Sequence, residues 1–205
     1  MDIKNEVMLD TGDLILFRGN SWISWFIEWF GWSRYSHVGI ILKNPKFLNH
    51  DLEDGLYLLE SSFNNIPDAE NHIIKTGVQI NRLDDILKLS TKGSVFVRKI
   101  NTNRDELFYE KLDTIHKEIH NKPYDFNIYD WLCAKYNLMC EIPVNSKYKS
   151  TKNFWCSALV SYIYCELGLI DNNINWSLIA PREYSSTEGK YIKFLCDIDN
   201  EKLLY

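Results

Sequence analysis

The order of apolar segments along this chain limits what it can fold into. Short runs with the β-branched and aromatic character of strands occupy the first 100 residues, and runs with helical spacing follow. Strands are expected at 14–17, 37–42, 56–61, 77–83 and 94–100, with a short helical LDDILKL segment between the last two. The spacing of the second and third runs predicts an antiparallel pair. Strands followed by helices indicate an α+β fold.

The apolar period changes to a helical one after Asn103. Helices are expected at 105–120, 126–138 and 156–167, and a last strand at 191–195. Gly168 directly follows the third helix and suits a left-handed C-terminal cap. Because the sequence shows no repeat, low-complexity segment or linker, we expect a single domain over residues 1–205.

Composition narrows the partners and the compartment. The 205-residue chain has a formal net charge of −5, so we expect no nucleic-acid partner, which would favour a basic surface. Five irregularly spaced cysteines and a polar N-terminal segment predict free thiols in a reducing, intracellular and cytoplasmic setting. The richness in Asn, Lys and Ile suggests an AT-rich genome, and host cytoplasm or a virion is expected if the source is viral.

Cys156 opens the apolar helical run SALVSYIYCELGL. The first turn of a helix presents unpaired N–H groups and about half a positive charge, which favours thiolate over thiol. We therefore predict that Cys156 is the reactive thiol among the five cysteines. The alternative is a small buried residue that only begins a core helix.

His37 and Glu60 are the candidate base and orienting carboxylate. His37 begins one expected strand and Glu60 lies near the far end of the next, so antiparallel pairing would place them within about one residue of each other. Glutamate in an apolar strand needs a partner, and a histidine would supply one. With Cys156 as nucleophile, the three residues form a Cys-His-Glu triad. The alternative is an exposed Glu60 and a His37 that only caps its strand.

Four blocks of the chain resemble a known family. The blocks are Gly12-Asp13-Leu14-Ile15, Tyr35-Ser36-His37-Val38-Gly39-Ile40, Leu59-Glu60-Ser61 and Trp155-Cys156-Ser157-Ala158-Leu159-Val160. They resemble the circularly permuted papain-like branch of the NlpC/P60 superfamily, which includes YiiX/YaeF-like proteins and their poxvirus relatives. The order His, Glu, Cys is the permuted one. Pro123-Tyr124-Asp125 and Pro181 also look like family landmarks.

The resemblance implies a papain-like α+β fold, with an antiparallel sheet or partial barrel packed against helices and a core at about 12–185. It implies that Cys156 is the nucleophile, His37 the base and Glu60 the third member of the triad. The Cys156 backbone N–H is one natural oxyanion donor. Tyr35 and Ser157 are candidates for further oxyanion or substrate contacts.

An aromatic segment precedes the histidine. Trp22, Trp25, Trp29 and Trp32 are spaced three, four and three apart, so on a helix they share one face. One interpretation is a core helix. The other is an apolar groove wall, formed by Trp25, Trp29 and Trp32, that borders the active site or touches a membrane surface.

His116 and His120 lie one helical turn apart, and Cys133 and Cys140 follow. Two histidines and two cysteines can hold zinc, but this spacing matches no common zinc module. We therefore expect no metal and no cofactor, with the two histidines facing solvent and the two cysteines in the core.

The sequence thus predicts a cysteine-dependent hydrolase or acyltransferase. Its substrate would be an amide or ester of a small molecule, a peptide or a lipid-linked amide, with peripheral membrane or lipid contact. The oligomeric state is left open. The first alternative is an inactive papain-like module that binds a lipid or a protein, and the second is a cell-wall-type peptidase. The absence of a wall-binding repeat counts against the peptidase.

Overall fold

A computed structural model describes residues 8–19, 34–125 and 151–205. Its main feature is an antiparallel sheet whose strands run in the order β4-β3-β2-β1-β5-β8. The strands are β1 Leu14–Phe17, β2 His37–Lys43, β3 Leu56–Ser62, β4 Gly77–Arg82, β5 Val95–Arg98 and β8 Lys202–Leu203. A two-stranded sheet pairs β6 Ile100–Asn101 with β7 Asp197–Ile198. The expected antiparallel pairing of the second and third strands is confirmed.

Three α-helices flank the sheet in the described part of the chain. They are α2 Leu83–Leu89, α3 Glu106–Ile119 and α5 Cys156–Glu166. Short 3₁₀ turns form η2 Pro45–Phe47, η4 Trp176–Leu178 and η5 Pro181–Tyr184. The structure is therefore a mixed α and β fold with an antiparallel sheet, as predicted. None of the helices in these described ranges is long and apolar enough to span a membrane.

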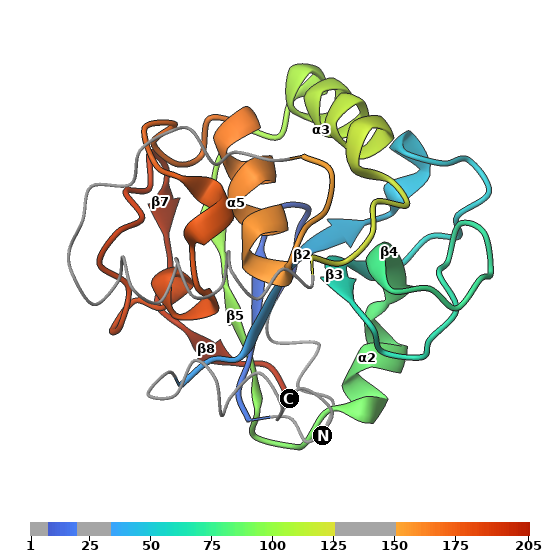
Figure 1. The fold of residues 1–205 in the computed structure, drawn as a ribbon, viewed down its shortest axis with the longest axis horizontal. Coiled ribbons are helices and arrows are strands. Elements are labelled where there is room, and N and C mark those ends of the chain that lie inside the picture. Colours follow the sequence, from blue (N-terminus) through green and yellow to red (C-terminus); the bar gives the residue numbers. More distant parts are fainter. Residues whose placement is uncertain (1–7, 20–33, 126–150) are drawn as a thin grey trace.

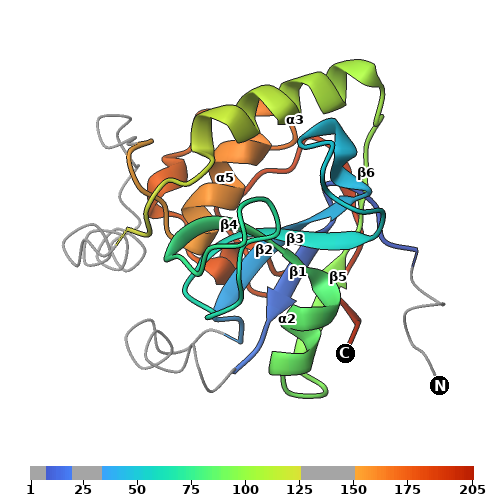
Figure 2. The same cartoon turned by 90° about the vertical axis from the view of Figure 1, so that its right-hand side faces the viewer.

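The helices lie on opposite sides of the sheet. α5 and α3 cover one face, and α2 covers the other (Figures 1 and 2). Alternate residues along each strand supply the two cores, as the two-residue period of a strand requires. Val38, Ile40 and Leu42 of β2 belong to the cluster beneath α5, whereas Ile41 belongs to the cluster beneath α2.

α3 owes its boundaries to a cap and an apolar stripe. The Asp105 carboxylate accepts a hydrogen bond from the backbone N–H of Phe108 at 3.0 Å, which satisfies one of the free donors at the helix start. Phe108, Leu112, Ile115 and Ile119 are buried on one side of the helix. The helical spacing in the sequence also placed Leu107 on this stripe, which is wrong, because Leu107 is 57% exposed.

α5 is held at its end by a glycine cap. Gly168 has φ of +72°, a conformation that disfavours residues with a Cβ. Its N–H donates to Cys165 O at 3.0 Å, and the N–H of Leu169 donates to Tyr164 O at 2.8 Å. These two bonds form a Schellman motif, so the predicted cap is confirmed. The cap therefore determines where the helix that begins at Cys156 ends.

One expected element is wrong, and two others fall outside the described residues. The expected strand 191–195 is reduced to an isolated bridge between Phe194 and Ile170, and the chain instead forms β7 and β8 further on. The expected helix 126–138 and the aromatic segment 21–32 lie entirely outside the described residues. Those two expectations stay predictions.

Candidate active site

Cys156 is the first residue of α5. Trp155 before it has extended backbone angles and forms the N-cap position. The Cys156 thiol is free, and the residue is only 6% exposed. The position is the one predicted from sequence, at the end of the helix where backbone N–H groups favour a negative charge.

The register of β2 and β3 brings His37 and Glu60 to the same face. Ile40 pairs with Leu59, and continuing that register places His37 opposite Ser62 and two residues from Glu60. The sequence predicted that His37 and Glu60 would be offset by about one residue across the strand pair, and the observed offset is two residues. An offset of two keeps both side chains on one face, and diagonal partners at this separation are still within reach of a long side chain.

The ring of His37 joins the other two residues. Its Nε2 lies 2.5 Å from Glu60 Oε2, and the Cys156 side chain is its second hydrogen-bond partner. Because Nε2 faces the carboxylate, Nδ1 is the nitrogen left for the thiol. The histidine is 4% exposed and the glutamate fully buried. Phe17 packs beside the histidine with 5.4 Å between ring centroids.

The neighbours of His37 favour its protonated form. Burial lowers the pKa of the ring, but the negative charges and hydrogen bonds of Cys156 and Glu60 outweigh burial and raise the pKa to about 10. An imidazolium between a thiolate and a carboxylate is the resting state of a thiol nucleophile. The structure therefore places a protonated imidazole between the Cys156 side chain and the Glu60 carboxylate.

A buried polar network holds the Glu60 carboxylate. Its Oε1 accepts hydrogen bonds from Ser62 Oγ at 2.9 Å and from Asn64 Nδ2 at 2.7 Å. Gln79 Nε2 donates to Ser62 Oγ at 2.6 Å, and Asn64 Nδ2 also donates to Asn81 Oδ1 at 2.9 Å. Both carboxylate oxygens are thus satisfied, so the carboxylate keeps one orientation toward the histidine.

Sequence reasoning missed this network. Gln79 and Asn81 alternate with apolar residues in β4, a pattern typical of a strand with one face in water. Both are in fact buried, at 1% and 0% exposure. Their burial follows from their position beside β3, and only the register of the β3–β4 pair reveals that position. Glu60 pairs with Gln79 across the two strands.

Tyr124 forms part of the site's surroundings. It is buried, and its ring packs edge-on against Phe63 with 5.9 Å between centroids. Burial raises the pKa of its hydroxyl, and the nearby charges of Cys156, Asp125 and Glu60 raise it further. The hydroxyl therefore stays protonated near neutral pH and is a donor close to the triad. The sequence argument noted this tyrosine only as a family landmark.

The further site candidates are placed differently. The Ser157 hydroxyl donates to Ile179 O at 2.6 Å, which ties α5 to the segment before η5. The Tyr35 ring packs edge-on against Phe96, 5.6 Å away, and burial and then the charge of Glu201 raise the pKa of its hydroxyl. A role for either residue at the oxyanion stays a prediction. Trp25, Trp29 and Trp32 lie outside the described residues.

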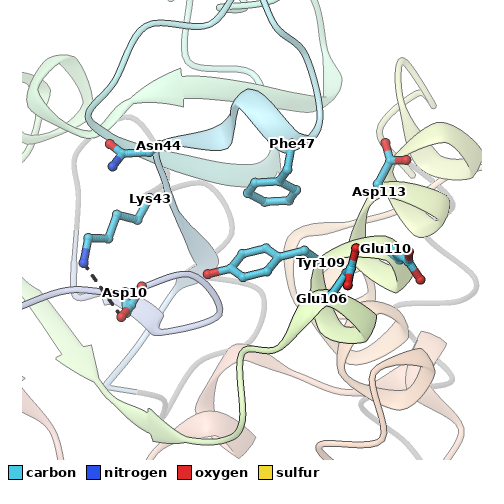
Figure 3. A pocket seen from close by; sticks show the side chains of 8 residues that line it. All are labelled: Asp10, Lys43, Asn44, Phe47, Glu106, Tyr109, Glu110 and Asp113. Atoms are coloured by element: carbon cyan, nitrogen blue, oxygen red, sulfur yellow. Dashed lines mark ion pairs between the residues drawn. The ribbon is translucent and has the colours of Figure 1, made fainter.

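A hollow of about 650 Å³ opens at the other end of β2. Its lining includes Lys43, Phe47 and Tyr109, and the two aromatic rings meet edge-on across it (Figure 3). Lys43 is six residues from His37 on the same strand, which is about 20 Å at 3.3 Å per residue. This hollow therefore belongs to a different part of the molecule from the triad.

His116 and His120 do not both face solvent as predicted. His116 is buried at 4% exposure, and the side chain of His120 is 27% exposed. Both histidines, at the end of α3, contact Glu70, which lies in the loop between β3 and β4. Glu70 is the residue that sequence reasoning missed, and Cys133 and Cys140 lie outside the described residues. These three side chains could hold a metal ion.

Comparisons with known proteins found solved structures to which the chain is similar. No protein-family model matches it, and no curated protein matches it. It is similar to the crystal structure of metalloprotein yiiX from Escherichia coli O157:H7, a DUF1105 protein, with 22% identity and a TM-score of 0.47. The similarity covers 76% of this chain and 64% of that protein, so the chain spans just under two thirds of its length.

Proposed function

We propose that this protein is a cysteine-dependent hydrolase or acyltransferase that acts on an amide or ester bond. The observation that carries the proposal is the position of the His37 ring, between the Glu60 carboxylate at 2.5 Å and the Cys156 side chain at the start of α5. A histidine that only capped its strand would not need a buried carboxylate with both oxygens satisfied.

The reaction follows from the positions of the three residues. The Cys156 thiolate attacks the carbonyl carbon, and the electron pair of the C=O bond moves to oxygen, where N–H groups at the start of α5 stabilise it. The carbonyl re-forms, and the bond to the amine or alkoxide breaks. The His37 imidazolium gives its proton to that leaving group. Glu60 holds the ring in the orientation that allows this transfer.

The second half of the reaction frees the enzyme. The product of the first half is a thioester on Cys156 and a neutral His37. Water, or another acceptor nucleophile, gives its proton to His37 and attacks the thioester. Release of the acid or transferred acyl group restores the thiolate and imidazolium. Water as acceptor makes the protein a hydrolase, and another nucleophile makes it an acyltransferase.

The chain order His37, Glu60, Cys156 supports assignment to the permuted papain-like branch that the sequence resembles. We also propose a single domain over residues 1–205, because one sheet joins strands from β1 near the N-terminus to β8 near the C-terminus. A lipid-linked or N-acylated substrate is the finer proposal, and it depends on the tryptophan spacing of residues 22–32. An intracellular location depends on the free cysteines described above.

Trapping the acyl intermediate tests the proposal. The full chain is mixed with a p-nitrophenyl acyl ester at about pH 7, quenched in acid, and analysed by peptide mass mapping. We expect one acyl group, on Cys156, and none in the Cys156→Ser variant. Cys196→Ser is the matched control, because this half-buried thiol lies in the C-terminal segment and should leave acylation unchanged.

Two outcomes would reject the enzyme. One is the absence of acylation with esters of short and long acyl chains while the protein is folded. The other is equal acylation of Cys165 or Cys196. In the first case the three residues belong to a binding module. Binding of the folded protein to lipid vesicles would then distinguish a lipid-binding module from a protein-binding one.

A further inference from the structure

Glu70, His116 and His120 bring three metal-ligating atoms to one point. Glu70 Oε2 lies 3.0 Å from His116 Nε2 and 2.7 Å from His120 Nδ1, and the donor atoms of all three residues lie within 4.8 Å of one another. Across a tetrahedral zinc ion, with bonds of about 2.0–2.1 Å, such atoms would be about 3.3 Å apart. A small outward shift of the side chains would therefore make room for an ion.

The orientation of the groups distinguishes this cluster from a simple ion pair. Glu70 Oε1 accepts a hydrogen bond from His116 Nε2 at 3.1 Å. Glu70 Oε2 is buried, and among the described residues it has no hydrogen-bond partner despite its two close nitrogen neighbours. The ring N–H groups therefore make no well-aligned hydrogen bond to this oxygen. A cation between the three groups would satisfy its lone pairs.

The surrounding loop is built to hold Glu70 in place. The buried Asp68 carboxylate accepts hydrogen bonds from the backbone N–H of Glu70 at 2.8 Å and of Ile80 at 3.0 Å. Asn71 Nδ2 donates to Asn121 Oδ1 at 3.1 Å, which links the loop to the residue after His120. Lys75, in the same loop, forms an ion pair with Asp68 at 3.0 Å. These bonds fix the backbone of the loop at Glu70 and leave its carboxylate to the two histidines.

The position in the fold also favours a positive ion. His116 lies in the last turn of α3, and His120 is its C-cap residue. A helix C-terminus carries about half a negative charge, which attracts cations. We propose that Glu70, His116 and His120 form a binding site for a divalent cation of the zinc class, with water as the fourth ligand. This site is separate from the triad.

The ligand types select the metal class. Two imidazoles and one carboxylate suit Zn²⁺, and three protein ligands leave the fourth position of a tetrahedron for water. Ca²⁺ and Mg²⁺ prefer oxygen ligands throughout, so they should bind poorly here. An ion in this place would fix the β3–β4 loop against α3, beside the segment whose Pro123 bridges to Gly77 of β4.

Zinc binding tests the site. Because the catalytic thiolate also binds zinc, the measurements use full-length Cys156→Ser protein, freed of metal with chelator and dialysed against Zn²⁺ at about pH 7. We expect one zinc per chain by metal analysis. Glu70→Gln and His120→Asn in the same background should weaken binding at least tenfold. His50→Asn, which changes an exposed histidine, should bind as the parent does.

Cobalt gives a second readout that does not depend on activity. Co²⁺ in this site should show the visible bands of a tetrahedral ion with nitrogen and oxygen ligands. A sulfur-to-cobalt charge-transfer band, or loss of binding in Cys133→Ser/Cys140→Ser, would show that cysteines bind the ion and would overturn the proposal. So would equal zinc affinity of the parent and Glu70→Gln proteins, or no bound zinc in a folded parent. Circular dichroism establishes folding of each variant.

Discussion

Glu60 and Glu70 each contact histidine, and they differ in how their carboxylate oxygens are satisfied. Glu60 Oε2 faces His37, and its Oε1 accepts two hydrogen bonds, from Ser62 and Asn64. Glu70 has one oxygen bonded to His116 and a second that lies close to two rings without a hydrogen bond among the described residues. The first carboxylate is complete with protein partners alone, whereas the second has room for the cation that we propose.

The difference shows how the same residue types perform different chemistry. A fully satisfied carboxylate fixes a histidine and its charge, which suits proton transfer. A carboxylate with free lone pairs directed at two nitrogens suits a metal ion. Histidine–glutamate contacts in a structure are therefore best sorted by counting the hydrogen bonds on each oxygen, before any role is assigned.

The largest expected effect comes from the nucleophile. Cys156→Ser should lower kcat/KM for an activated ester by about 10⁴-fold or more, because hydroxyl is a far weaker nucleophile than thiolate at neutral pH. Cys196→Ser should retain the parent rate. The measurement is steady-state release of p-nitrophenol at about pH 7. A Cys156→Ser protein within tenfold of the parent would exclude Cys156 as the nucleophile.

Removal of the Glu60 charge should have the next largest effect. Glu60→Gln keeps the shape of the side chain but removes the anion that orients His37, and we expect kcat/KM to fall about 10³-fold. Glu53→Gln is the matched control, because Glu53 is exposed and pairs only with Arg82 in the described structure. In the Cys156→Ser background, zinc binding of Glu60→Gln should equal that of the parent, which separates the two glutamates. Equal kinetic effects of Glu60→Gln and Glu53→Gln would contradict a triad role.

The pH profile reports the charge on His37. Its pKa is raised to about 10, so the ring keeps the proton needed by the leaving group as pH rises through neutrality. The value of kcat/KM for an amide substrate should therefore hold to about pH 10 and fall above it. Without the Glu60 charge that helps to raise this pKa, the alkaline limb of Glu60→Gln should move to lower pH. Rates measured from pH 6 to 11 would show an unmoved limb if the carboxylate had no such influence.

The smallest effect is expected in the network behind Glu60. Asn64→Ala removes a donor to the carboxylate and should lower the free energy of unfolding by about 1–3 kcal/mol, the usual cost of an unsatisfied buried group. The value of kcat/KM should fall about tenfold through looser orientation of His37. Urea unfolding and ester kinetics measure the two. Asn173→Ala, in an exposed turn, is the control, and an equal loss of stability in both variants would count against the network.

Local patterns in the sequence predict most of the described fold. Apolar runs locate the strands of the main sheet, and Cys156 and Gly168 mark the two ends of α5. The two-residue β8 has no pattern long enough to be recognised, and it exists because its residues pair with β5. The apolar residues at 191–195 favour a strand, but only Phe194 finds a backbone partner.

The site is predictable only where residues lie on recognisable elements. His37 and Glu60 lie on adjacent strands, so their contact follows from pairing, apart from the exact offset. Gln79 and Asn81 look like solvent-facing residues until the register places them against Glu60 and Asn64. Glu70 lies in a loop, and nothing in its local sequence connects it to α3. Contacts of that kind depend on the tertiary fold alone.

The separation of the triad along the chain has a consequence for protein synthesis. Strands β1 to β5, with His37 and Glu60, all precede residue 100, whereas Cys156 is made much later. Chains emerge from the ribosome N-terminus first, so the strands that carry His37 and Glu60 are made before the helix that carries Cys156. A truncated chain that ends before α5 lacks Cys156. It also leaves uncovered the sheet face that α5 buries, and such apolar surface directs incomplete chains to chaperones and proteases.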